Sequence, residues 1–167
     1  AWFWPIDVNR FKIGRSVATV LDLMDRYPEL TFMQNQAKVY EYCKEDFPEL
    51  YEALKERVAE GRWEVNGAMW TEPDCNMPSG ESLVRQLTFG LRFFREEFGS
   101  SGEALVVMDA FGYSWALPQL LRRSGVKYFL TNKMSWSQFN RLPYDSFNWR
   151  GIDGSTVLTH QLTARSP

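Results

Sequence analysis

Apolar residues recur at intervals of three and four positions over residues 11–27, which predicts a helix that packs by one face. The same spacing predicts a helical stretch around Tyr40, and then a helix that begins with a capping box at residues 46–49 and ends at Gly61. A later, longer helix is predicted to end at Gly99. Its expected apolar stripe comprises Val84, Leu87, Leu91, Phe94 and Phe98.

Short runs between the helical segments are strand candidates. These runs cover residues 30–33, 62–66, 104–108 and 127–130. The run at 104–108 is apolar throughout, which is typical of a strand covered on both faces. A helix through Pro118 that ends at Gly125 follows it, and two short strands around the turn at 151–154 predict a hairpin.

Strand and helix alternate along most of the chain, which predicts an α/β fold with a parallel sheet or barrel. A full eight-unit barrel needs roughly 250 residues, so a chain of 167 residues holds only part of one. In such folds the reactive side chains gather where strands end and helices begin. Those positions are residues 34–36, 66–74, 109–113 and 131–133.

Composition narrows the class of protein. The chain is 44% hydrophobic and 16% aromatic, which indicates one globular domain without a disordered or membrane-spanning signature. A formal charge of −2 without a basic run argues against nucleic acid as a partner. Cys43 and Cys75 lack C-x-x-C spacing, so no disulfide framework is expected and a reducing compartment is compatible. Residues 1–5 lack an initiator Met and are too short for a signal peptide.

Asp109 is the strongest candidate for chemistry. It follows five apolar residues, and a carboxylate in that place is expected to be hydrogen-bonded, ion-paired or metal-bound rather than solvated at the surface. The structural alternative is a carboxylate that caps the next helix. Lys133, at the end of the following strand, is a candidate ion-pair partner or else an exposed lysine.

Other polar and aromatic residues fall at the same predicted edge. Glu72 and Asp74 could supply the second carboxylate that glycoside chemistry requires, or they could brace their loop. His160 is the only histidine, which excludes a multi-histidine metal site within this chain and favours a structural role. The tryptophans that lie in or near turns, as sugar platforms or as plugs, are Trp2, Trp4, Trp70, Trp115 and Trp136.

The segment that begins at Asp109 resembles the nucleophile segment of family 38 α-mannosidases, in which an Asp precedes x-Phe-Gly and a Leu-Pro-Gln helix. Here it reads DAFGYS at 109–114, then LPQLL at 117–121 and Gly125. Similar segments follow the same order across nearly the whole chain: AWFWP at 1–5, NQA at 35–37, YE at 40–41, WTEPD at 70–74, NMPSGESLVRQ at 76–86, FLTNK at 129–133 and GIDGS at 151–155. They favour the cytosolic and vacuolar-like branch and its bacterial relatives, and thus a cytoplasmic location.

This resemblance implies a fold, a metal and a set of site residues. Residues 1–167 are expected to form part of a (β/α)7 catalytic barrel, incomplete at both ends. The family holds a divalent cation, usually zinc, between a His-x-Asp pair, the nucleophilic Asp and a distant His. Only Asp109 of these ligands is present, so the other ligands and the acid/base carboxylate are expected outside this chain. We further predict that the substrate is contacted by Trp2, Glu72, Asp74, Tyr113 and Lys133.

The implied activity is retaining hydrolysis of terminal α-D-mannosyl residues of mannose-containing oligosaccharides by a double displacement, with Asp109 as nucleophile. The chain by itself is expected to be inactive. No membrane partner is expected, and a homo-oligomer of the full-length protein stays open. One alternative is a metal-dependent polysaccharide deacetylase on a related barrel, which the single histidine disfavours. The other is a non-catalytic carbohydrate-binding module.

Overall fold

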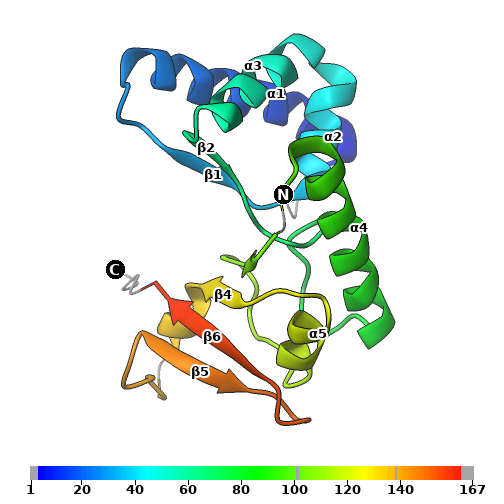
Figure 1. The fold of residues 1–167 in the computed structure, drawn as a ribbon, viewed down its shortest axis with the longest axis vertical. Coiled ribbons are helices and arrows are strands. Elements are labelled where there is room, and N and C mark those ends of the chain that lie inside the picture. The colour runs from blue at the N-terminus through cyan, green and yellow to red at the C-terminus, as the bar shows by residue number, and fades with distance from the viewer. Residues whose placement is uncertain (1–3, 101, 138, 163–167) are drawn as a thin grey trace.

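The computed structural model describes residues 4–100, 102–137 and 139–162. In its first part, three helices pack against two short strands, and Figure 1 shows these elements together at the top of the molecule. The elements are α1 (Ile6–Arg26), β1 (Phe32–Gln34), α2 (Ala37–Asp46), α3 (Pro48–Ala59) and β2 (Trp63–Val65). The predicted helices and strands of this part are confirmed, with boundaries that differ by a few residues.

In the second part, a long helix leads into a four-stranded sheet. Figure 1 shows α4 along one side of the molecule, linking the upper helices to the lower sheet. The elements are α4 (Gly80–Phe98), β3 (Ala104–Val106), α5 (Leu117–Arg123), β4 (Tyr128–Thr131), the 3-10 helix η1 (Lys133–Trp136), β5 (Ser146–Arg150) and β6 (Thr156–Gln161). The predicted hairpin is confirmed, since β5 and β6 pair antiparallel.

The strands run in one direction except for β5. β1 pairs parallel with β2, and β3, β4 and β6 pair parallel in that order. A parallel bridge between Gly67 and Leu105 joins the first sheet to the second. β1 and β5 are edge strands, so the described residues form no closed barrel. The prediction of an α/β fold with parallel strands is confirmed, whereas the barrel is not.

Two corrections concern helix ends and faces. The capping box at residues 46–49 is wrong, because Phe47 precedes α3 without a side-chain cap and the Asp46 carboxylate accepts hydrogen bonds from Arg10 on α1 at 2.5 Å instead. The stripe of α4 begins one residue earlier than predicted: Leu83 is buried and Val84 is exposed. The glycine that ends α4 is confirmed, since Gly99 adopts a left-handed conformation with φ of 65°.

Two apolar clusters form the core, and α4 contributes to both. Its Phe94 packs with α1, α2 and α3, while its Leu87 packs beneath β3 and α5. Both cysteines are free and buried, and burial raises the pKa of each thiol to about 11. Among the described residues, no helix is long and apolar enough to cross a membrane.

Candidate active site

Polar residues from four neighbouring strand ends lie together at one edge of the sheet. Asn35 follows β1, Glu72 lies in the loop after β2, Asp109 follows β3 and Lys133 follows β4. Hydrogen bonds and an ion pair connect the four: Glu72 contacts Asn35 and the backbone of Asp109, and Asp109 contacts Lys133. The predicted gathering of side chains at the carboxyl ends of parallel strands is therefore confirmed for these positions.

The Asp109 carboxylate extends beyond the sheet edge. Its side chain is 57% exposed, so the expectation that it is shielded from solvent is wrong. Within the apolar run, Val107 is buried and Met108 is half-buried, and the turn that follows carries the carboxylate outward. The expected ion pair is present, with Lys133 Nζ 2.9 Å from Asp109 Oδ1. The alternative role as a helix cap is excluded, since α5 begins at Leu117 without a side-chain cap.

Lys133 is held by aromatic rings as well as by the carboxylate. Its side chain is 15% exposed. Its ammonium lies 3.5 Å from the ring centroid of Trp136 and 5.5 Å from that of Phe111, within reach of cation–π attraction. These three side chains border a pocket of about 330 Å³, whose other lining residues are Ala110, Gly112, Tyr113, Met134 and Ser137. We call it the Asp109 pocket, because Asp109 lies directly before it in the chain and pairs with its lysine.

Both carboxylate oxygens of Glu72 accept hydrogen bonds from other residues of the chain. Oε1 accepts hydrogen bonds from the backbone N–H groups of Met108 and of Asp109, the latter at 2.7 Å. Oε2 accepts one from Asn35 Nδ2 at 3.4 Å. The same Asn35 nitrogen donates to the Val106 carbonyl at 2.8 Å. The sequence marked Asn35 only as a polar residue at a strand end, and nothing in it indicates these partners.

Asp74 and Tyr113 also contact their own surroundings. The Asp74 carboxylate accepts hydrogen bonds from the backbone of Met77 and Asn76, which lower its pKa. The Tyr113 hydroxyl donates toward the Val107 and Ala110 carbonyls and shares a short hydrogen bond with Thr131. Burial raises the pKa of Tyr113 to about 12. Their predicted contacts with substrate stay predictions.

The remaining predicted residues lie apart from this cluster or outside the described chain. Trp2 lies outside the described residues. His160 is exposed on β6, and its Nδ1 lies 2.8 Å from the Ser146 hydroxyl on β5, a contact between paired strands. Among the described residues, no three His, Cys, Asp or Glu side chains come together as a metal site. Asp109 is thus the one predicted ligand for which the structure gives a position.

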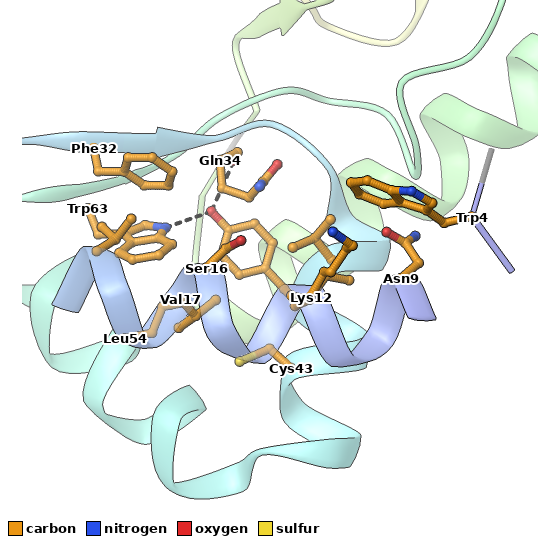
Figure 2. A pocket seen from close by; sticks show the side chains of 14 residues that line it. Trp4, Asn9, Lys12, Ser16, Val17, Phe32, Gln34, Cys43, Leu54 and Trp63 are labelled. Carbon is orange, nitrogen blue, oxygen red and sulfur yellow. Dashed lines mark hydrogen bonds between the residues drawn. The ribbon is translucent and has the colours of Figure 1, made fainter. Parts of the chain in front are cut away.

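A second pocket, of about 170 Å³, lies between α1 and the β1–β2 pair, apart from the cluster around Asp109; of the predicted candidates it contains Trp4 and Gln34. Figure 2 shows the rings of Phe32 and Trp63 at one end of its lining and that of Trp4 at the other. The Trp63 indole donates to the Tyr40 hydroxyl, which donates to the Gln34 carbonyl, both at 3.0 Å. Lys12 lies over the Trp4 ring at 3.6 Å. We call it the Trp4 pocket.

Comparison with known proteins identifies the family to which the chain is similar. A model described as "Glycosyl hydrolases family 38 N-terminal domain" matches residues 1–166. Alpha-mannosidase G of Dictyostelium discoideum is 46% identical over 159 residues, which are 95% of this chain and 15% of that protein. An alpha-mannosidase of Saccharomyces cerevisiae is 45% identical over 161 residues, which are 96% of this chain and 15% of that protein. The chain thus spans about 15% of the length of these curated relatives.

The fold is similar to that of a solved structure. A crystal structure of an alpha-mannosidase from Enterococcus faecalis V583 superimposes with a TM-score of 0.82 and covers 96% of this chain and 18% of that one. The two sequences are 20% identical, so this likeness concerns the fold.

Proposed function

The chain belongs to glycosyl hydrolase family 38, and we propose that it supplies the nucleophile of a retaining α-mannosidase. The observation that carries this proposal is the position of Asp109, an exposed carboxylate at the carboxyl edge of a parallel sheet, paired with Lys133 beside an aromatic pocket. The substrates of the complete protein would be oligosaccharides that end in α-D-mannosyl residues. The names of the relatives at 46% and 45% identity support this choice of sugar.

The reaction would proceed in two displacements. An oxygen of the Asp109 carboxylate attacks the anomeric carbon, while a separate carboxyl group protonates the leaving oxygen as the glycosidic bond breaks. That second group then removes a proton from water, which attacks the anomeric carbon and releases mannose from Asp109 with net retention. Lys133 holds Oδ1 of Asp109, which leaves Oδ2 as the candidate attacking atom.

The second carboxyl group is not assigned to a described residue. Retaining enzymes place their two carboxyl groups about 5–5.5 Å apart. Glu72 and Asp74, the carboxylates nearest to Asp109 in the loop after β2, accept hydrogen bonds from the backbone of the chain itself. A group engaged in this way is poorly suited to deliver a proton to the substrate. We therefore propose that the acid/base residue lies outside this chain.

A divalent cation, zinc by the family resemblance, is proposed as cofactor with Asp109 among its ligands. A carboxylate oxygen is an ordinary ligand of zinc, and the Asp109 side chain is 57% exposed, so it is open to an ion from outside the described residues. The described residues offer no cluster of three ligating side chains around it. Such a metal would orient the sugar hydroxyls when bound. Cytoplasmic location and a homo-oligomeric state stay predictions.

Aromatic rings beside Asp109 support a sugar substrate. Phe111 is 61% exposed and Trp136 is 52% exposed, and both border the Asp109 pocket. Exposed rings of this kind pack against the apolar faces of sugars. Lys133 lies between these rings and the carboxylate, so we propose that it helps to hold the sugar as well as Asp109.

The test is hydrolysis of an aryl α-mannoside by the complete protein, with and without a strong chelator, compared with Asp109→Asn. We expect chelator-sensitive turnover in the wild type and a loss of about 10⁴-fold in the variant, a typical effect of removing a catalytic nucleophile or its partner. A wild-type protein without turnover in the presence of any divalent metal would contradict the proposal. A variant as active as the wild type would exclude Asp109 as nucleophile.

A non-catalytic carbohydrate-binding module is the second candidate. One observation favours it. In the cluster of Asn35, Glu72, Asp109 and Lys133, only Asp109 among the described residues directs a carboxylate to solvent. This alternative predicts mannoside binding without turnover, and binding that Asp109→Asn leaves intact. Equilibrium binding of a mannoside to both proteins distinguishes it from the enzyme.

A further inference from the structure

The backbone of the Asp109 loop is held by a side chain from the neighbouring strand end. Glu72 Oε1 accepts hydrogen bonds from two consecutive backbone N–H groups, those of Met108 and Asp109. Hydrogen bonds to an ionised carboxylate are roughly twice as strong as neutral ones. Two such bonds to adjacent peptide groups fix both the position and the direction of the chain at Asp109.

Glu72 is in turn fixed by Asn35. The Asn35 amide nitrogen donates to Glu72 Oε2 at 3.4 Å and to the Val106 carbonyl at 2.8 Å. The backbone of Asn35 lies against Gly67, where an added Cβ would be only 2.0 Å from the Asn35 carbonyl oxygen. Three strand ends are thereby tied together, with β1 and β2 holding the end of β3 through side chains.

We propose that Glu72 is a positioning residue for Asp109, acting through the backbone of residues 108 and 109. This inference rests on the proposed function, because it assigns Glu72 a role in presenting the nucleophile. Glu72 sets where the Asp109 carboxylate stands relative to the sugar, whereas Lys133 holds one of its oxygens from the other side. Substrate binding outside this loop does not depend on Glu72.

Kinetics of Glu72 variants of the complete protein test this role. We expect kcat on an aryl α-mannoside to fall about 100-fold in Glu72→Ala, the order of effect that a 1 Å misplacement of a reacting group produces. KM should change little. Glu72→Gln keeps an oxygen that can accept from the same N–H groups without the charge, so its kcat should recover to about a tenth of the wild-type value.

Asp153→Ala is the matched control. The Asp153 carboxylate also braces a turn, by accepting from the backbone N–H and the hydroxyl of Ser155 at 3.0 and 2.8 Å. This turn precedes β6, at the opposite edge of the sheet from Asp109. We expect wild-type kcat in Asp153→Ala. A Glu72→Ala protein with the same kcat as this control would overturn the inference.

Hydrogen exchange gives a second readout that does not require turnover. The amides of Met108 and Asp109 should exchange faster in Glu72→Ala than in the wild type, and at the wild-type rate in Asp153→Ala. Unchanged exchange at these two amides overturns the inference. If Glu72→Ala does not fold, Glu72→Gln takes its place, and the two amides should still exchange faster than in the wild type because their hydrogen bonds lose the charge of the acceptor. If the wild type lacks turnover, the proposed function fails, and exchange still decides whether Glu72 holds the loop.

Discussion

The Asp109 pocket and the Trp4 pocket use tryptophan and lysine in different ways. In the Trp4 pocket, rings and aliphatic side chains from α1, α2, α3 and the β1–β2 pair surround a small apolar space, and its lysine contacts a ring (Figure 2). In the Asp109 pocket, the lysine contacts a ring and also a carboxylate that is open to solvent. The apolar contacts around the Trp4 pocket thus contribute to packing, whereas the charged side chains of the proposed site lie where the loops after the strands meet.

The difference predicts that substitutions near the Trp4 pocket change stability and those at the Asp109 pocket change activity. Phe94 is fully buried in the cluster that lies against the Trp4 pocket, and its ring packs edge-on against Tyr40 at 5.9 Å. Phe94→Ala should lower the free energy of unfolding by about 3–5 kcal/mol. Denaturant unfolding measures this loss. An equal loss of kcat at a temperature where the variant is folded would break the distinction.

Lys133 and Lys12 form a matched pair for comparing the two pockets, because the ammonium of each lies within 3.6 Å of a tryptophan ring centroid. Lys133→Met should lower kcat/KM about 10- to 100-fold, since it removes a charge-assisted contact to the proposed nucleophile. Lys12→Met keeps the length of the side chain and touches no carboxylate of the cluster, so we expect wild-type kcat/KM. Similar losses in both variants would mean that the ring contact, not the ion pair, matters.

A substitution at Tyr40 tests only how the Trp4 pocket contributes to stability. Its buried hydroxyl accepts from Trp63 and donates to the Gln34 carbonyl, and burial raises its pKa. Tyr40→Phe leaves both partners without this hydroxyl, so the free energy of unfolding should fall by about 1–3 kcal/mol. Thermal unfolding of the variant checks the value. An unchanged melting temperature would show that water replaces the hydroxyl at no cost.

The two cysteines, one in each core cluster, should affect stability only at alkaline pH. Burial raises the pKa of Cys43 and Cys75 from 9.0 to about 11. Because the unfolded chain releases these protons first, stability should fall as pH rises from about 9 toward 11 and stay unaffected by them below pH 9. Urea unfolding at several pH values measures this slope. Rapid alkylation of either thiol in the folded protein at pH 8 would contradict their burial.

The sequence predicted the elements with a clear period and missed features that depend on distant partners. α1 and α4 were predictable because their apolar stripes extend over several turns. The cap at Asp46 was wrong because Arg10, which is 36 positions away, binds its carboxylate. The exposure of Asp109 was also missed, since the apolar run before it says nothing of the turn that follows.

The candidate site was only partly predictable for the same reason. Parallel-strand topology placed Glu72, Asp109 and Lys133 at one edge, and the ion pair between the last two is confirmed. The contacts of Glu72 with the backbone at Asp109 and with Asn35 span 37 positions each. No periodicity or local motif encodes such pairs, so the loop that presents Asp109 could be described only from the structure.

Covalent trapping tests the central claim, that Asp109 is the nucleophile, most directly. A fluorinated α-mannosyl fluoride, whose glycosyl-enzyme hydrolyses slowly, is incubated with the complete protein, and the labelled peptide is sequenced by mass spectrometry. The account predicts one mannosyl adduct on Asp109 and none in Asp109→Asn. An adduct on another carboxylate, with Asp109 unmodified, would contradict it.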